Sequence, residues 1–254
     1  MWWILVAVLV VVPAAAAELK SASVAAFDRY VRETEQRLDE HKGALWADAS
    51  PGRAQRLRNG EILVEPFHAN PLVSVRDGLI HDWIGAAFLP GVTVEQTLAL
   101  VQDYNKHKQY YRPEVVESRI LSHEDDHFRV FLRLLKKQVV TVVLDTEHDI
   151  RYEHLGPQNW RSASRSTRIS EVQNAGEANE KVLPAGTGQG FLWKLNSYWR
   201  FQERDGGTWI ECEAISLTRD IPVGLGWLIQ PIIRNLPRES LQNTLKSTVA
   251  ALKH

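Results

Sequence analysis

The chain has 254 residues, 44% of them hydrophobic and 24% charged, with a formal net charge of -1. This length and balance are those of an ordinary globular protein with a substantial core. The near-neutral charge and the lack of a long Lys/Arg tract exclude the basic footprint of a nucleic-acid-binding protein, so we expect no nucleic-acid partner.

The N-terminus is an unbroken apolar run from Trp2 to Val12, followed by Pro13 and four alanines. An apolar run that ends in small residues is typical of a secretory signal peptide. The run is shorter than the roughly 20 residues of a membrane-spanning helix. We therefore expect residues 1–17 to be cleaved and the protein to be exported, periplasmic or secreted. No Lys or Arg precedes the run, so a retained membrane anchor stays as the alternative.

Residues 18–78 form an N-terminal extension in this interpretation. Apolar residues recur at helical spacing between Ser21 and His41, which predicts an amphipathic helix. Residues 44–60 contain Pro-Gly and are expected to form a loop. The main domain is expected over 79–254.

The main domain begins with a predicted strand over 79–89. Thr93 then opens a helix, because Gln96 three residues later completes a capping-box pattern, and Pro113 is expected to end it. Alternating apolar residues and turn signals predict six further strands, and Asp-Gly-Gly at 205–207 predicts a tight hairpin between the last two. These strands are expected near 115–122, 128–134, 140–150, 160–172, 191–201 and 208–219.

The C-terminal region carries leucines and isoleucines at helical spacing from Leu225 to Leu252. Pro231 and Pro237 interrupt it, so we expect a short helix, a kink at 235–237 and a second helix over 237–252. The order strand, helix, antiparallel strands and long helix predicts an α+β fold. In it a curved antiparallel sheet wraps around the C-terminal helix and leaves an apolar space between them.

Three stretches resemble the START-like superfamily, in its polyketide cyclase and coenzyme Q-binding branch. They are GVTVEQT at 91–97, GFLWKLNSYWRF at 190–201 and SLTRDIPVGLGW at 216–227. The resemblance covers about 79–252 and implies a helix-grip fold with a hydrophobic ligand cavity. It also implies access to the cavity near the loop before the last helix. It carries over no catalytic residue, because the superfamily shares none.

The 205–207 hairpin fixes which side chains share a face. A two-residue turn pairs Trp199 with Cys212, and cross-strand partners lie on the same side of a sheet. We expect the inward set to line the cavity: Trp193, Leu195, Trp199, Phe201, Ile210, Cys212 and Ala214. Arg200 and Glu211 fall on the other face, where we expect an exposed ion pair.

Further lining residues come from other elements. By alternation Val142, Leu144 and His148 face inward, and His148 either hydrogen-bonds a ligand or is a satisfied core histidine. Tyr110 and Tyr111 are expected at the cavity mouth or packed at a helix end. Leu225 and Trp227 are expected in a lid between the last strand and the last helix, or in a connection that only docks that helix.

Other chemical motifs give no site. His-Glu-Asp-Asp-His at 123–127 lies on a predicted turn, and the glycine-rich 186–190 precedes a strand and lacks a phosphate-loop Lys. We expect no metal, cofactor or catalytic residue. The favoured function is binding or transport of a hydrophobic, lipid-like molecule, with peripheral membrane contact for ligand exchange. A cyclase or dehydratase acting in the same cavity, or an envelope interaction module with a filled core, stays open.

Overall fold

The computed structural model describes residues 17–41, 44–70, 72–137, 141–220 and 226–253, with only the backbone of 226–234. The expected signal peptide at 1–17 therefore lies, apart from residue 17, outside the described residues. None of the helices in the described ranges is long and apolar enough to cross a membrane.

The N-terminal part contains both helices and strands. In chain order these are β1 (Ala17–Glu18), α1 (Ser21–Glu40), the 3-10 helix η1 (Trp46–Ala49), α2 (Pro51–Arg58), β2 (Leu63–Pro66), β3 (Leu72–Val75), β4 (Gly78–Pro90), α3 (Val94–Val101), the 3-10 helix η2 (Tyr104–Lys106) and α4 (His107–Tyr110). The remainder is β5 (Val115–Glu124), β6 (His127–Lys137), β7 (Thr141–Gly156), β8 (Asn159–Gln173), β9 (Lys181–Val182), β10 (Thr187–Gly188), β11 (Lys194–Arg204), β12 (Gly207–Thr218) and α5 (Gly226–Leu252).

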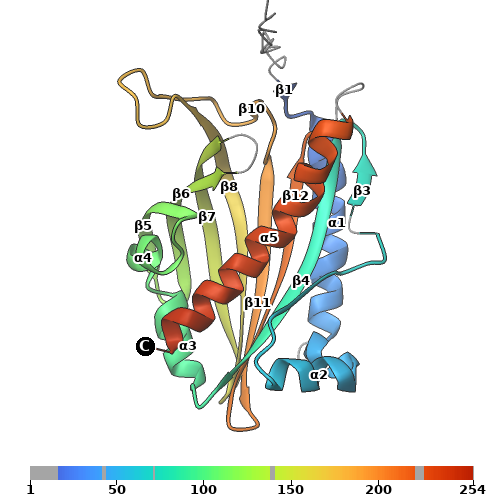
Figure 1. The fold of residues 1–254 in the computed structure, drawn as a ribbon, viewed down its shortest axis with the longest axis vertical. Helices are drawn as coiled ribbons and strands as arrows, with labels where there is room; N and C mark the ends of the chain where they lie inside the picture. Colours follow the sequence, from blue (N-terminus) through green and yellow to red (C-terminus); the bar gives the residue numbers. More distant parts are fainter. Residues whose placement is uncertain (1–16, 42–43, 71, 138–140, 221–225, 254) are drawn as a thin grey trace, which may run out of the picture.

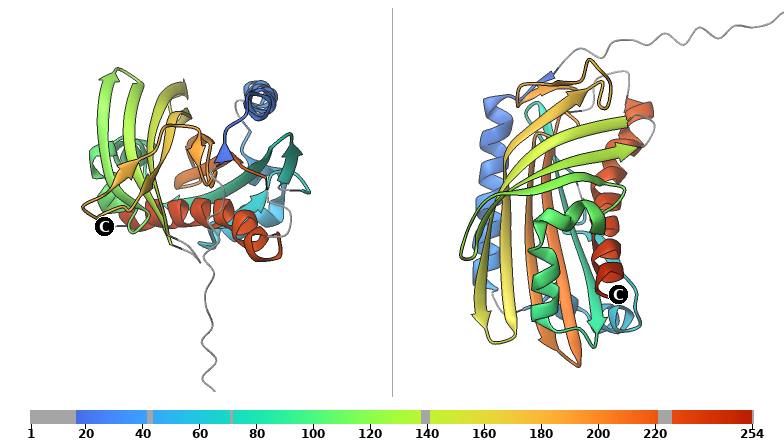
Figure 2. Two further views of the ribbon diagram at one scale, coloured as in Figure 1. Left: turned by 90° about the horizontal axis from the view of Figure 1, so that it is seen from above. Right: turned by 90° about the vertical axis from the view of Figure 1, so that its left-hand side faces the viewer.

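The main sheet is antiparallel and has the strand order β2-β4-β12-β11-β8-β7-β6-β5, with β3 also paired to β4. The sheet curves around α5, which runs diagonally across its concave face (Figure 1). Helix α1 lies on the opposite, convex face (Figure 2). The predicted α+β helix-grip fold is thus confirmed, with α1 as a further layer.

Two local predictions are confirmed in detail. Thr93 and Gln96 form the predicted capping box at the start of α3. The 205–207 hairpin pairs Trp199 with Cys212 as predicted. Asp205 and Gly206 both adopt positive φ, which matches the twist of the two strands.

Three predictions about helices are wrong. Helix α5 is a single helix from Gly226 to Leu252, where two separate helices were expected; burial of its apolar side against β4 outweighs the local cost of proline. The stretch 44–60 is not a loop, because Pro51 stands at the first position of α2, where its missing N–H costs nothing. Helix α3 ends at Val101, well before Pro113.

The expected exposed pair between Arg200 and Glu211 is also wrong. Glu211 does face away from the cavity, but only 2% of it is exposed, because η1 covers it. Its carboxylate accepts hydrogen bonds from the backbone N–H groups of Trp46 at 2.9 Å and Ala47 at 2.7 Å. Arg200 instead donates to the carbonyl of Ala44.

A second buried acid lies beneath α1. Asp82 is 2% exposed and accepts a 2.7 Å hydrogen bond from the Tyr30 hydroxyl. Burial, and then the nearby Glu213 carboxylate, raise the pKa of Asp82 to about 7, against the opposing effects of the Tyr30 hydrogen bond and of Arg37. Arg37 itself pairs with Glu213 at 2.5 Å. The contact between α1 and the sheet is therefore sensitive to protonation.

This arrangement predicts a pH-dependent stability. Since the folded state holds the Asp82 proton more tightly than the unfolded chain does, its contribution to stability falls as pH rises from about 4 to about 7. Asp82→Asn keeps an acceptor for Tyr30 and removes the titration. Denaturant unfolding gives the free energy of unfolding of both proteins at pH 4 and pH 8. The difference between variant and wild type should be larger at pH 8 than at pH 4 by about 1 kcal/mol or more, in favour of the variant. Asp28→Asn, at an exposed position of α1, is the control; equal shifts for both variants would contradict the prediction.

Candidate functional site

A cavity of about 480 Å³ lies between the concave face of the sheet and α5. Its floor consists of side chains from β6, β7, β8, β11 and β12, and its roof comes from α5 and the segment 104–115. Most of the lining atoms are apolar. The side chains lie in layers across the sheet, because directly paired residues of neighbouring strands share a face.

The inner end of the cavity is aromatic. Trp199 and Phe201 stack with parallel rings 5.8 Å apart. The hydroxyls of Tyr104 and Tyr152 share a 2.7 Å hydrogen bond. Cys212, the only cysteine of the chain, lies beside Trp199 on the neighbouring strand. Burial raises the pKa of the Cys212 thiol, which keeps it neutral. This end of the cavity is therefore lined by aromatic rings and uncharged groups.

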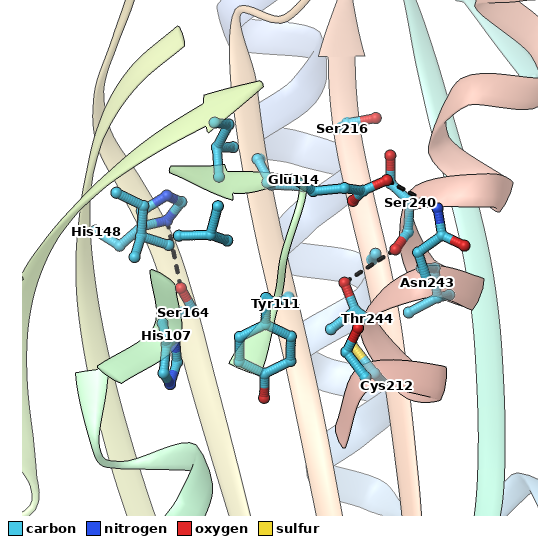
Figure 3. A pocket seen from close by; sticks show the side chains of 18 of the residues that line it. His107, Tyr111, Glu114, His148, Ser164, Cys212, Ser216, Ser240, Asn243 and Thr244 are labelled. Atoms are coloured by element: carbon cyan, nitrogen blue, oxygen red, sulfur yellow. Dashed lines mark hydrogen bonds between the residues drawn. The ribbon is translucent and has the colours of Figure 1, made fainter. Parts of the chain in front are cut away.

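The middle of the cavity carries hydroxyl groups. Ser164 and Ser197 lie directly opposite each other on β8 and β11. Across the cavity, Ser240 and Thr244 of α5 point toward the same space (Figure 3). The two α5 hydroxyls donate to backbone carbonyls of their own helix, at 2.8 and 2.9 Å. These four side chains, called the hydroxyl band below, therefore present neutral hydrogen-bonding groups rather than charges.

His148 lies at the edge of this band and is 5% exposed. Its Nε2 is 3.1 Å from Thr146 Oγ1, and its Nδ1 is 3.4 Å from Ser164 Oγ (Figure 3). The Thr146 hydroxyl donates to the Leu132 carbonyl, so it accepts from Nε2–H and leaves Nδ1 to accept from Ser164. Burial lowers the pKa of His148 to about 4, which keeps the ring neutral at pH 7.

A cluster of charged side chains borders the cavity where α5 faces the segment between α4 and β5. Glu114 accepts a hydrogen bond from Lys136 of β6 and another, at 2.8 Å, from Asn243 of α5 (Figure 3). Arg112 and Lys246 also belong to the lining. The sequence analysis missed this group. Alternation from Phe128 would have placed Lys136 on the inner face, but the predicted strand ended at residue 134.

Eight of the residues predicted by strand alternation line the cavity. They are Leu195, Trp199, Phe201, Cys212, Ala214, Val142, Leu144 and His148. Their role in ligand binding stays a prediction.

Three other predicted site residues lie elsewhere. Trp193 is buried in a core cluster that includes Phe27 of α1, because β11 begins only at Lys194 and the alternation does not extend to it. Ile210 is fully buried in the core. Tyr110 packs against the same core, whereas Tyr111, which was predicted with it, lines the cavity.

The predicted lid residues are not described. Leu225 lies outside the described residues, and of Trp227 only the backbone is described, within α5. Their role stays a prediction.

The glycine-rich stretch 186–190 surrounds one of the protein's own carboxylates. Glu171 accepts hydrogen bonds from the backbone N–H groups of Gln189 at 2.7 Å and Gly190 at 2.8 Å. A Cβ on Gly188 would lie 2.4 Å from Glu171 Oε2, so only glycine fits there. This contact fixes the segment that leads into Phe191, which lines the cavity.

Comparisons with known proteins gave matches among solved structures. A scan against protein-family models and a search of curated proteins found no match. The chain is similar to a STAR-related lipid transfer protein fragment from Xanthomonas axonopodis, with 16% identity, a TM-score of 0.49 and coverage of 72% of this chain and 98% of that one. It is also similar to the Zhui aromatase/cyclase from Streptomyces sp. R1128 (12% identity, TM-score 0.46, coverage 68% and 94%). A third match is human STARD10 (9% identity, TM-score 0.44, coverage 79% and 80%). The order and pairing of the elements described above are those of a helix-grip fold.

Proposed function

We propose that this protein binds or carries a hydrophobic, lipid-like small molecule. The observation that carries this proposal is the cavity of about 480 Å³ with an aromatic inner end. Sites for single small molecules have volumes of roughly 300–1,000 Å³ and are lined mostly by apolar groups with a few polar ones. The hydroxyl band supplies polar groups of that kind.

The state of His148 favours binding over catalysis. General acid–base chemistry needs a titratable group with a free position toward the substrate and a pKa near the working pH. His148 has both ring nitrogens in hydrogen bonds and a pKa of about 4. It therefore fits a satisfied core histidine better than a catalytic base.

Mass spectrometry tests the proposal directly. Native spectra of the purified protein should show one bound small molecule, which organic extraction then releases for identification. After extraction, the protein should bind an apolar fluorescent probe with a stoichiometry of one. If the protein carries no extractable molecule and binds no such probe, the proposal is wrong.

We further propose that the protein acts after export, as the apolar run from Trp2 and the alanines before residue 18 indicate. Intact-mass measurement of the protein recovered from the periplasm or medium should show the loss of about the first 17 residues. A full-length product that fractionates with membranes would contradict export as a cleaved protein.

A further inference from the structure

In the part of the chain that the structure describes, the cavity lining is exposed to solvent at one place. Among its described lining residues, Arg112, Pro113, Asn243 and Lys246 are exposed, while the rest are buried or half-buried. The first two lie between α4 and β5, and the other two lie on α5. The opening is therefore the gap between this connection and the C-terminal half of α5.

Lys136 lies at the inner side of this opening. Its side chain is 15% exposed, and that of its partner Glu114 is 21% exposed. Glu114 reaches from the connection toward Asn243 on α5 (Figure 3), so the pair spans the gap. An ammonium group has three donor hydrogens, and the bond to Glu114 uses one of them.

The opening carries a surplus of positive charge. Its lining contains the cations Arg112, Lys136 and Lys246 and a single carboxylate, that of Glu114. Glu239, close enough to Lys136 to attract it, adds a second negative charge behind the lining. Three cations against two carboxylates favour a group with one negative charge, and partial burial of Lys136 strengthens that attraction compared with bulk water.

From this arrangement we propose that the ligand is an amphiphile with a carboxylate, which binds to Lys136 at the opening while its apolar part extends to Trp199 and Phe201. This inference rests on the proposed function, since it names the chemical class of the ligand in the same cavity. The polarity changes in one direction, from the charged opening through the hydroxyl band to the aromatic end. A ligand with one acidic end matches that order when it enters with its apolar end first.

Three ligands of equal chain length test the proposal. Dodecanoate, dodecanol and dodecyltrimethylammonium share one apolar chain and differ in head-group charge. Calorimetric titration of the extracted protein, below the micelle concentration of each ligand, should give the tightest binding for dodecanoate. Because hydrogen bonds to charged groups are the strong ones, dodecanol should bind about tenfold more weakly. The ammonium ligand should bind weakest of the three.

Two variants separate direct contact from a structural role. Lys136→Met should weaken dodecanoate binding at least about tenfold and leave dodecanol binding nearly unchanged. Glu114→Gln should tighten dodecanoate binding, since Lys136 loses its competing carboxylate. Lys137→Met is the matched control, because Lys137 is the exposed neighbour on the other face of β6 and should have no effect. Melting curves establish that each variant is folded.

The outcomes distinguish this inference from the proposed function. If all three ligands bind with equal affinity, the carboxylate proposal is wrong and the cavity remains an apolar binding site. If none of them binds, both proposals fail. If Lys136→Met and Glu114→Gln weaken all three ligands alike, the ion pair only holds the connection against α5, and the carboxylate proposal is again wrong.

Discussion

Replacing Ser197 with phenylalanine should abolish binding of apolar ligands while the protein stays folded. Ser197 is at the centre of the cavity floor, and its neighbours across the sheet, Ser164 on β8 and Ala214 on β12, are both small. A phenyl ring there extends into open space rather than into packed atoms. It takes up volume that the ligand needs and covers the hydroxyl band. Titration with an apolar fluorescent probe should show at least about a hundredfold loss of affinity, if two or more ligand groups lose their buried contacts.

Ser122→Phe provides the matched control for this prediction. It makes the same substitution on an exposed part of β5, outside the cavity, and should bind the probe like wild type. The melting temperature of Ser197→Phe should equal or exceed that of the unliganded wild type, because the ring gains apolar contacts. Unchanged probe affinity in a folded Ser197→Phe protein would show that ligands bind elsewhere.

Leu245→Ala should destabilise the fold by about 2–5 kcal/mol, the usual range for a fully buried leucine. Leu245 is fully buried and holds α5 against β4. The helix approaches the strand closely at Gly85, where a Cβ would lie 2.7 Å from Leu245 Cδ1. Gly85→Ala alone should therefore cost about 1–3 kcal/mol by overpacking.

The double variant tests whether these two residues set the distance between helix and strand. With Leu245 shortened to alanine, the new methyl at position 85 no longer meets Cδ1 and fills part of the void. Denaturant unfolding should show the double variant more stable than the sum of the single effects by about 1 kcal/mol. Additive losses would mean that a Cβ at position 85 is excluded by the Leu63 carbonyl and Val64, its other close neighbours, and not by Leu245.

The sequence predicted the features that depend on local rules. The capping box at Thr93, the hairpin at 205–207 and the alternation along the later strands each involve residues that are close in sequence or directly paired. These rules gave the strand order near the hairpin and eight of the cavity residues. The predicted breaks at proline failed at α2 and α5, because the local cost of a proline depends on its position in the helix and on the packing around it.

The features that failed depend on which element covers which surface. Alternation placed Glu211 on the outer face of the sheet but gave no information about η1, which buries it. The same limit applies to Trp193, which is buried in a cluster that includes Phe27 of α1, far away in sequence. Lys136 was missed for a different reason. The predicted strand ended at residue 134, although its alternation, continued to residue 136, places this lysine inside.

The N-terminal layer limits how far the chain can be shortened. A fragment that starts at residue 79 would lose β2 and β3, so β4 would become an unprotected edge with free backbone donors and acceptors. It would also uncover Ile80, Ile215 and Trp209, which α1, η1 and α2 now shield from water. Such a fragment would be prone to self-association, and its failure to bind a ligand would say nothing about the cavity.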